Sequence, residues 1–187
     1  LVALVLLAPL LAVLAILVRL DSPGPVLFRQ QRVGRNFRPF AIVKLRTMVP
    51  DAAGLGAAIT VGGDPRVTRV GRVLRAAKLD ELPQFWNVLK GEMSVVGPRP
   101  EVPRYVERFR ADFEEILRVR PGITDLASLT YRNEESVLAR AADPEAVYVT
   151  DVLPAKIALA KEYVRQRSLR LDLAIIARTV VALFDRR

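Results

Sequence analysis

The sequence predicts an α+β fold that is predominantly helical and starts with a membrane-inserted helix. Three observations predict it: residues 1–18 carry no charge, residues 26–48 read as two short strands, and apolar residues after position 100 recur at helical spacing. We expect two parts, a membrane-inserted helix over residues 1–20 and a domain outside the membrane over residues 21–187. Amphipathic helices are expected at the C-terminal end of that domain, packed at the membrane face.

The first segment is apolar enough to enter a bilayer. Of residues 1–18, 13 are Leu, Ile or Val. These residues favour insertion by about 4 to 8 kcal/mol, whereas Pro9 costs a helix interior about 3 kcal/mol. We therefore expect an inserted helix broken at Ala8 and Pro9, because proline removes a hydrogen bond and clashes with the preceding turn. A straight spanning helix and a re-entrant helix bent at Pro9 both fit this pattern. A signal peptide fits poorly, since a basic start and a cleavage site are missing.

Positive charge dominates the chain and favours an anionic partner. Lys and Arg number 29 against 20 Asp and Glu, which gives a net charge of +9 and a sequence pI near 10.6. The partner classes are nucleic acid, an acidic membrane face or a phosphorylated substrate. By the positive-inside tendency, five arginines directly after the apolar segment place the following domain in the cytoplasm. They are Arg19, Arg29, Arg32, Arg35 and Arg38.

The chain has no Cys and no His, which removes several kinds of chemistry. Nucleophile systems of the Ser-His and Cys-His types are excluded, as are zinc sites built from Cys and His. Catalysis would have to use carboxylates, Lys, Arg, Tyr, hydroxyl groups or a hard metal ion held by oxygen ligands. The lack of disulfides is compatible with the cytosol.

The first half of the domain is expected to contain a hairpin, a loop and a helix. The two strands flank residues 34–36, which read as the hairpin turn. Residues 51–66 are rich in Gly, Ala and Asp and predict a mobile loop. A helix is expected to begin at Pro83 and to end at Gly91, because proline suits the first helical position and glycine suits the end.

The second half of the domain is expected to be mainly helical. One should begin near residues 100–101, and its core face is marked by apolar residues at every fourth position, namely Tyr105, Phe109, Phe113 and Leu117. A short helix is expected over residues 133–142, and a long helical region should start at Pro154. Its apolar stretch 173–184 is too short to span a bilayer. This stretch either packs on the domain or lies as an amphipathic helix on the membrane surface.

Two adjacent carboxylates, Asp80 and Glu81, are the strongest candidates for chemistry. They directly precede the helix expected at Pro83, so capping of that helix would be a purely structural explanation. Basic residues nearby favour a functional one. They are Arg72, Arg75 and Lys78 before the pair, Lys44 and Arg46 at the end of a predicted strand, and Arg99 between Pro98 and Pro100. The two prolines hold the Arg99 backbone extended, which suits a guanidinium that binds phosphate oxygens.

This combination predicts Mg²⁺-dependent phosphoryl chemistry at a membrane surface. A carboxylate can attack phosphorus and divide one transfer into two steps. Mg²⁺ would neutralise a diphosphate and assist the leaving group. Without histidine, this is one of the few covalent routes open to the chain.

Five stretches occur in the order DSPGPVLFRQQRVGRNFRPF, KLRTM, DPRVTRVGRVLR, LDELPQFWNVLKGEMSVVGPRPE and RPGIT. Together they resemble the bacterial monotopic phosphoglycosyl transferases, also called polyprenyl-phosphate sugar-1-phosphate transferases or bacterial sugar transferases. The resemblance runs over nearly the whole chain and is densest between Asp21 and Glu101. Several long motifs in the right order make it specific.

The resemblance implies transfer of a sugar 1-phosphate from a nucleotide diphosphate sugar, usually a UDP-sugar, to undecaprenyl phosphate, with release of UMP. This is the first membrane step in making glycans such as exopolysaccharide. By the resemblance, Asp80 is the nucleophile that forms a phosphosugar-aspartyl intermediate, Glu81 is its partner, and Mg²⁺ binds beside both. Phosphate or nucleotide contacts fall on Arg75 and on the loop of Pro98, Arg99 and Pro100, while Lys44 and Arg46 line the same pocket.

The resemblance also implies a re-entrant first helix and an active site at the cytoplasmic face of the bacterial inner membrane, in contact with anionic lipids. A homodimer through the C-terminal helices is compatible with the sequence. Three positions depart from the common family pattern. Ala8 replaces a serine before Pro9, Asp125 and Ser128 follow RPGIT where sugar or lipid preference is expected to be set, and Lys78 replaces a small polar residue.

Two other functions compete with this one. A membrane-anchored basic module for anionic lipid or nucleic acid would use the charge alone. Aromatic residues make up only 6% of the chain and are not interleaved with the basic residues, which argues against single-strand nucleic acid as a partner. A hydrolase would use the same pocket with water as acceptor, but it would not need the membrane segment.

Overall fold

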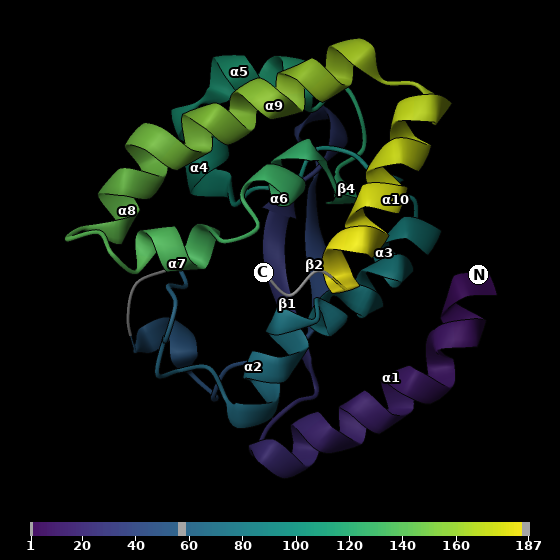
Figure 1. Cartoon of the computed structure of the whole chain (residues 1–187), viewed down its shortest axis with the longest axis vertical. Coiled ribbons are helices and arrows are strands. Elements are labelled where there is room, and N and C mark those ends of the chain that lie inside the picture. Colours follow the sequence, from purple (N-terminus) through teal and green to yellow (C-terminus); the bar gives the residue numbers. More distant parts are fainter. Residues whose placement is uncertain (1, 56–58, 185–187) are drawn as a thin grey trace.

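The computed structural model describes residues 2–55 and 59–184. A β-hairpin runs through the middle of the molecule, α1 lies along one side, and α9 spans the opposite edge (Figure 1). The predicted α+β, predominantly helical fold is confirmed. The described helices and strands divide into a membrane-type helix, two small sheets and a helical half that carries most of the core.

Helix α1 (Val2–Asp21) is continuous, and Pro9 lies inside it. Its ribbon changes direction near the N-terminal end, so the expected break at Ala8 and Pro9 is a bend within one helix (Figure 1). Leu14 and Val18 are buried against the domain, whereas most other large side chains of α1 are exposed. Among the described residues, Ala3–Asp21 is the one helix long and apolar enough to cross a membrane, with a mean hydropathy of 2.7.

The predicted hairpin is confirmed as β1 (Leu27–Val33) and β2 (Pro39–Leu45), which pair antiparallel through a short 3-10 turn, η1 (Arg35–Phe37). Asn36 in the turn has a φ of 56°, a conformation that asparagine tolerates better than most residues. The hairpin forms the floor on which the candidate site is built, because β2 packs closely against the segment that follows α2.

A second sheet was not predicted. β3 (Ser94–Val96) and β4 (Gly122–Thr124) pair in parallel, with Ser94 opposite Gly122. Gly97 and Gly122 lie so close together that a Cβ on either residue would overlap the backbone of the other segment. The crossing brings the Gly-Pro-Arg-Pro loop against the Arg-Pro-Gly-Ile-Thr segment, although more than 20 residues separate them in sequence.

The region around the two carboxylates differs from the prediction. Helix α2 (Arg69–Ala76), which was not expected, starts at Thr68, whose hydroxyl accepts a hydrogen bond from the Gly71 amide at 3.0 Å. A 3-10 helix, η3 (Leu79–Gln84), follows and leads into α3 (Phe85–Leu89). The helix expected to begin at Pro83 therefore begins at Phe85, because Pro83 already lies in η3. Its end near Gly91, which has a φ of 75°, is confirmed.

The loop predicted over residues 51–66 is irregular apart from a short turn, η2 (Ala52–Gly54). Residues 56–58 lie outside the described residues. The C-terminal end of the loop is fixed, since the buried carboxylate of Asp64 accepts hydrogen bonds from the Arg66 side chain at 2.7 to 3.1 Å. The mobility of the rest stays a prediction.

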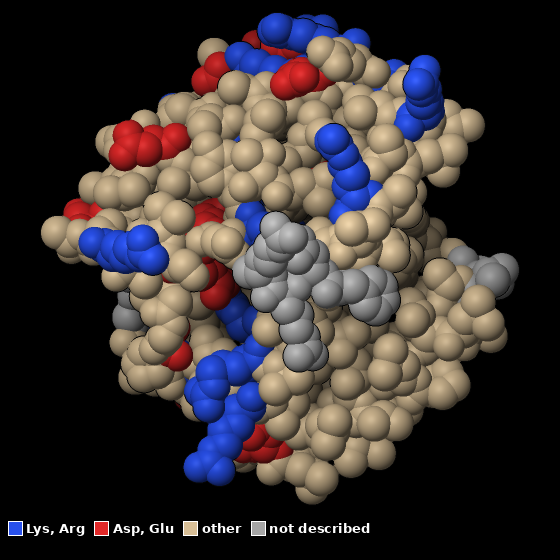
Figure 2. All heavy atoms as spheres, in the orientation of Figure 1, with Lys and Arg blue, Asp and Glu red and all other residues tan. Residues whose placement is uncertain are grey.

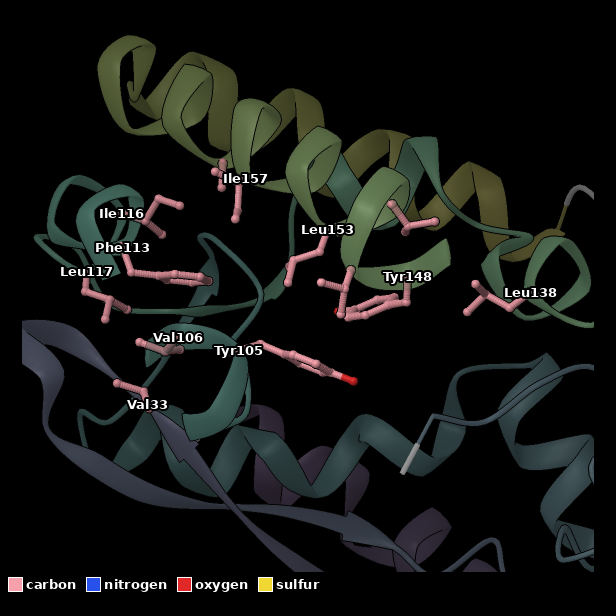
Figure 3. Packing of buried hydrophobic residues seen from close by; sticks show 13 residues of the cluster. Val33, Tyr105, Val106, Phe113, Ile116, Leu117, Leu138, Tyr148, Leu153 and Ile157 are labelled. Carbon is pink, nitrogen blue, oxygen red and sulfur yellow. The ribbon is translucent and has the colours of Figure 1, made fainter. Parts of the chain in front are cut away.

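The helical half carries the main hydrophobic core (Figure 3). Its helices are α4 (Pro103–Arg108), α5 (Arg110–Ile116), α6 (Leu126–Thr130), α7 (Glu134–Leu138), α8 (Pro144–Val147), a π-helical turn η4 (Tyr148–Val152), α9 (Leu153–Gln166) and α10 (Leu169–Phe184). The predicted core face is confirmed: Tyr105, Phe113 and Leu117 are buried, and Phe109 packs against them. The helix expected from residues 100–101 starts later and is divided in two, because Phe109 leaves helical geometry.

The long helical region expected from Pro154 is two helices, α9 and α10, separated near Arg167. α10 packs on the domain, since Ile175 is buried and the Thr179 hydroxyl lies 2.7 Å from the Thr124 hydroxyl. Its other face exposes apolar side chains that include Leu173 and Val181. Packing on the domain is thus confirmed, and contact of the exposed face with a membrane surface stays a prediction.

Candidate active site

Asp80 and Glu81 lie in η3, which packs on β2, and both side chains are buried, with 6% and 8% of each residue exposed. The segment enters η3 through Lys78, whose φ of 56° turns the chain sharply after α2. Asn87 fixes the same region to the hairpin. It donates to the Ala41 carbonyl at 2.8 Å and accepts from the Val43 amide at 3.1 Å. A fully buried amide thus fixes α3, which follows η3 directly, against β2.

Glu81 is held between two cations. Its carboxylate accepts a hydrogen bond from Lys44 Nζ at 2.9 Å and two from the Arg99 guanidinium, at 2.5 and 3.3 Å. Burial alone would raise the pKa of Glu81, but the charges of Arg99 and Lys44 hold it well below its usual range. Burial lowers the pKa of Lys44, and Glu81 opposes that shift. Glu81 is therefore ionised and orients both cations.

Asp80 has the opposite environment. Its Oδ1 is buried and has no hydrogen-bond partner within the described part of the chain. Burial raises the pKa of Asp80, and the nearby charge of Lys44 limits the rise. A buried carboxyl oxygen without a partner is costly, and together with the shifted pKa it marks Asp80 as a candidate functional group. Both acids lie in the first turn of η3, but within residues 2–55 and 59–184 neither carboxylate forms a capping hydrogen bond at the start of η3 or α3.

The loop of Pro98, Arg99 and Pro100 is fixed at each residue. The Pro98 carbonyl accepts a hydrogen bond from the Gly122 amide at 3.0 Å, and the Pro100 carbonyl accepts one from the Arg32 side chain at 3.0 Å. Between them, the Arg99 amide donates to the Asp125 carboxylate at 3.0 Å. The backbone is therefore held on both sides of the guanidinium that contacts Glu81.

A buried network lies behind this loop. Arg32 forms an ion pair with Glu101 at 3.2 Å, and the Tyr148 hydroxyl donates to the same carboxylate at 2.7 Å. Burial and the Glu101 charge raise the pKa of Tyr148, so it stays a neutral donor. The network connects β1, the Arg99 loop and the helical half.

Of two arginines predicted to line the site, Arg75 lies within electrostatic reach of Asp80 and Arg46 lies at the end of α1. Arg75, on the last turn of α2, forms an ion pair with Glu135 of α7, and its charge still acts on Asp80. Arg46 is not brought to the dyad, contrary to the expectation that it lines the same pocket. Its guanidinium donates to the carbonyls of Ser22 and Pro23 just after α1, where it holds the C-terminal end of that helix.

The residues present fit a single Mg²⁺ that is shared with the substrate better than a metal site whose ligands all come from the protein. Among the described residues, no group of three or more Asp, Glu, His or Cys side chains is arranged to hold a metal. The Asp80 carboxyl group, whose Oδ1 has no partner, could supply one ligand oxygen, and Mg²⁺ usually takes one or two carboxylates together with substrate phosphates. Glu81 could contribute only by giving up part of its contact with Lys44 or Arg99.

Sequence reasoning missed two residues that position the site. Asp125 was expected to influence sugar or lipid preference, but its carboxylate accepts from the Arg99 and Ser128 amides and so fixes the Arg99 loop and the start of α6. Asn87 was not singled out. Its signal was weak, because one Asn within an apolar stretch identifies a buried amide only when its partners are known.

Figure 2 shows how charge is distributed over this face of the molecule. Basic and acidic atoms gather in a recess near its middle, and a basic band continues from the recess over the region of α2. Arg69, Arg72 and Arg75 lie on that helix. A recess that holds both basic and acidic atoms and continues into a basic band suits an anionic, phosphate-bearing substrate.

The family model described as bacterial sugar transferase matches residues 1–186. The chain belongs to that family. This sugar transferase is 44% identical over 179 residues to the UDP-glucose:undecaprenyl-phosphate glucose-1-phosphate transferase of Caulobacter vibrioides, with 94% of this chain and 63% of the relative covered. It is 40% identical over 184 residues to the UDP-N-acetylgalactosamine-undecaprenyl-phosphate N-acetylgalactosaminephosphotransferase of Aeromonas hydrophila, with 96% and 40% covered.

The exopolysaccharide production protein PSS of Rhizobium leguminosarum bv. phaseoli is 40% identical to this sugar transferase over 187 residues, with 96% of this chain and 88% of the relative covered. The chain thus matches nearly all of one relative but only 63% and 40% of the length of the other two. The family resemblance inferred from the motifs is confirmed.

Proposed function

We propose that this sugar transferase moves a sugar 1-phosphate from a UDP-sugar to undecaprenyl phosphate, releases UMP and thereby initiates exopolysaccharide or related glycan assembly. The observation that carries the proposal is the buried, unpartnered Oδ1 of Asp80 beside a Glu81 that fixes Lys44 and Arg99. The names of the relatives support both the acceptor and the class of donor.

In the proposed first step, Asp80 Oδ1 attacks the sugar-side phosphorus of the donor. A bond forms between that oxygen and phosphorus, the bond to the bridging oxygen breaks, and UMP leaves with both electrons. Lys44 and Arg99 stand next to Asp80 and would carry the charge that develops on the phosphate oxygens. Glu81 keeps the two cations in place without competing as a nucleophile, since both its oxygens are already hydrogen-bonded.

In the second step, a phosphate oxygen of undecaprenyl phosphate attacks the same phosphorus. The bond between phosphorus and Asp80 breaks, which regenerates the carboxylate and yields the lipid diphosphate sugar. No proton transfer is required in either step, so the absence of histidine is no obstacle. The burial of Asp80 limits the access of water to the intermediate.

Mg²⁺ is proposed as the cofactor. Asp80 would hold it together with the donor diphosphate, and Glu81 would lie beside it. When bound, the ion would neutralise the diphosphate and stabilise the leaving UMP.

The proposed location is the cytoplasmic face of the bacterial inner membrane. The exposed apolar side chains of α1 would enter the bilayer, and the arginines that follow α1 would remain on the cytoplasmic side. Because α3 contacts α1 and directly follows η3, the dyad would lie near the membrane surface that presents the lipid acceptor.

The test is UMP release by the protein in nanodiscs with Mg²⁺, undecaprenyl phosphate and a panel of UDP-sugars. We expect release with one sugar, dependent on the lipid and on Mg²⁺. An Asp80→Asn variant should lose at least about a thousandfold in kcat, because the amide oxygen is a poor nucleophile.

Three outcomes would contradict the proposal. Steady turnover without lipid would indicate a hydrolase, and full activity of the Asp80→Asn variant would exclude the aspartyl route. No UMP from any donor in a folded protein would exclude UDP-sugars as substrates.

A further inference from the structure

A second anionic site is suggested by a hollow of about 450 Å³ on the molecule's surface. Its walls come from the hairpin turn, β3, the link between α5 and β4, and the link between α9 and α10. The polar residues that line it include Arg35, Ser94, Arg118, Arg120, Arg167 and Asp172. This volume lies within the range of about 300 to 1,000 Å³ that is typical of small-molecule sites.

The hollow is separate from the candidate active site. None of Asp80, Glu81, Lys44 and Arg99 lines it. Those residues belong to η3, to β2 and to the loop after β3, whereas the hollow uses Ser94 and Val96 within β3 itself.

Four arginines line the hollow, and none of them forms an ion pair among the described residues. Arg35, Arg118, Arg120 and Arg167 form no hydrogen bond or ion pair with a carboxylate within residues 2–55 and 59–184. The acid in the lining, Asp172, already accepts a hydrogen bond from the Tyr163 hydroxyl at 2.8 Å.

Some other surface arginines of this half are ion-paired, although Arg108 and Arg140 are not among the ion pairs of the described residues. Arg165 binds Glu115 through two hydrogen bonds, and Arg110 binds Glu107 at 2.9 Å. Glu115 is the acid nearest in sequence to Arg118, and it is occupied by Arg165. Four like charges around one concave surface repel one another, and a bound anion would remove that cost.

We propose that this hollow binds a ligand that carries two or more phosphate groups. Guanidinium groups match phosphate oxygens through paired hydrogen bonds, and four of them can satisfy a diphosphate or triphosphate. The Ser94 hydroxyl in the same lining can donate to a further oxygen. The ligand chemistry is shared by soluble nucleotides and by anionic lipid headgroups. The exposed Leu169 at the edge of the hollow makes the second source worth testing.

The test measures binding of inorganic triphosphate by calorimetry to the whole chain in phosphatidylcholine nanodiscs. The altered protein carries Arg118→Gln and Arg167→Gln, two exposed positions at the hollow. The matched control carries Arg108→Gln and Arg140→Gln, which remove the same charge from exposed positions that do not line it. Thermal unfolding checks that all three proteins are equally folded.

We expect the hollow variant to lose about tenfold or more in triphosphate affinity at one site, while the control keeps the affinity of the unaltered protein. Equal weakening in both variants would overturn the proposal, because it would reduce the effect to net charge. Unchanged binding in the hollow variant would overturn it as well. Since the readout is binding, it does not depend on the proposed transfer reaction.

A second arm identifies the source of the phosphate. The same titration is repeated in nanodiscs that contain cardiolipin, an anionic lipid whose headgroup carries two phosphates. Loss of triphosphate binding at the Arg118 and Arg167 site would support a lipid headgroup as the natural ligand. Unchanged binding would support a soluble nucleotide.

Discussion

Asp80 and Glu81 are neighbours in the chain, yet their surroundings push their pKa values in opposite directions. Glu81 is bound by Lys44 and Arg99, and its pKa lies well below the usual range. The Oδ1 of Asp80 has no partner, and burial raises the pKa of that carboxyl group. Pairs of acids separated in this way take different roles in active sites. Here one carboxylate organises the cations and the other is left available to react.

Glu135 binds Arg75, the arginine that the motifs assign to phosphate contact. Its carboxylate forms an ion pair with Arg75. A Glu135→Gln substitution should therefore lower the KM for the donor by about twofold to fivefold, the range expected from losing one exposed ion pair, with little change in kcat. Steady-state kinetics with a varied donor concentration measures it.

The control for this prediction is the adjacent Glu134→Gln substitution, which breaks a contact with Lys156 that is 2.8 Å long and remote from Arg75. Its KM should stay unchanged. A higher KM in the Glu135→Gln variant would show that Glu135 assists donor binding rather than competing with it.

Among the structural elements, the loop between β2 and α2 is fixed by one buried pair. Asp64 accepts hydrogen bonds from Arg66, and this bonding keeps the pKa of Asp64 below its usual value. The carboxylate therefore contributes stability that is present above the unfolded pKa of about 3.9 and is lost as the pH falls through the lower folded value.

We expect an Asp64→Asn variant to be less stable than the unaltered protein by about 1 to 3 kcal/mol at neutral pH. The difference should shrink below about pH 4 and vanish once Asp64 is protonated in the folded protein. Thermal unfolding in detergent over a pH series measures it. The exposed Asp51→Asn substitution in the same loop is the control and should have little effect. A difference that persists undiminished at the lowest pH would contradict the assignment.

Sequence patterns predicted the elements that carry strong periodicity or proline and glycine signals. The hairpin, the core face of Tyr105, Phe113 and Leu117, and the apolar first helix were all legible. The sheet of β3 and β4 was not, because strands of three residues show no alternation. Helix α2 was missed because its basic residues obscure a short apolar face of Leu74 and its neighbours.

Site residues could be predicted where they belong to a sequence motif. They could not be predicted where their role depends on a tertiary contact. Lys44 and Arg99 were expected near the dyad, and the structure brings both to Glu81. Arg46 comes from the same motif as Lys44. Residues two apart in a strand share a face, but β2 ends at Leu45, so Arg46 lies beyond the strand and reaches the end of α1 instead. The structural role of Asp125 depends on the crossing of Gly97 and Gly122, which no local pattern shows.

For the whole molecule, the fold joins an apolar surface to a charged recess. α1 exposes Leu6, Ile16 and Leu20, and α3, which follows the dyad directly, exposes Trp86 and Leu89. Covering these side chains with lipid would bring Asp80 close to the bilayer. The family to which the chain belongs, and relatives named for undecaprenyl phosphate, fit that arrangement.

The central claim is that Asp80 becomes covalently bound to the sugar phosphate. The most direct measurement is the intact mass of the protein after incubation with Mg²⁺ and the productive UDP-sugar, without undecaprenyl phosphate. We expect one added sugar phosphate on the unaltered protein, none on the Asp80→Asn variant, and loss of the adduct when the lipid is supplied. An adduct on the Asp80→Asn variant, or one that the lipid does not remove, would contradict the account.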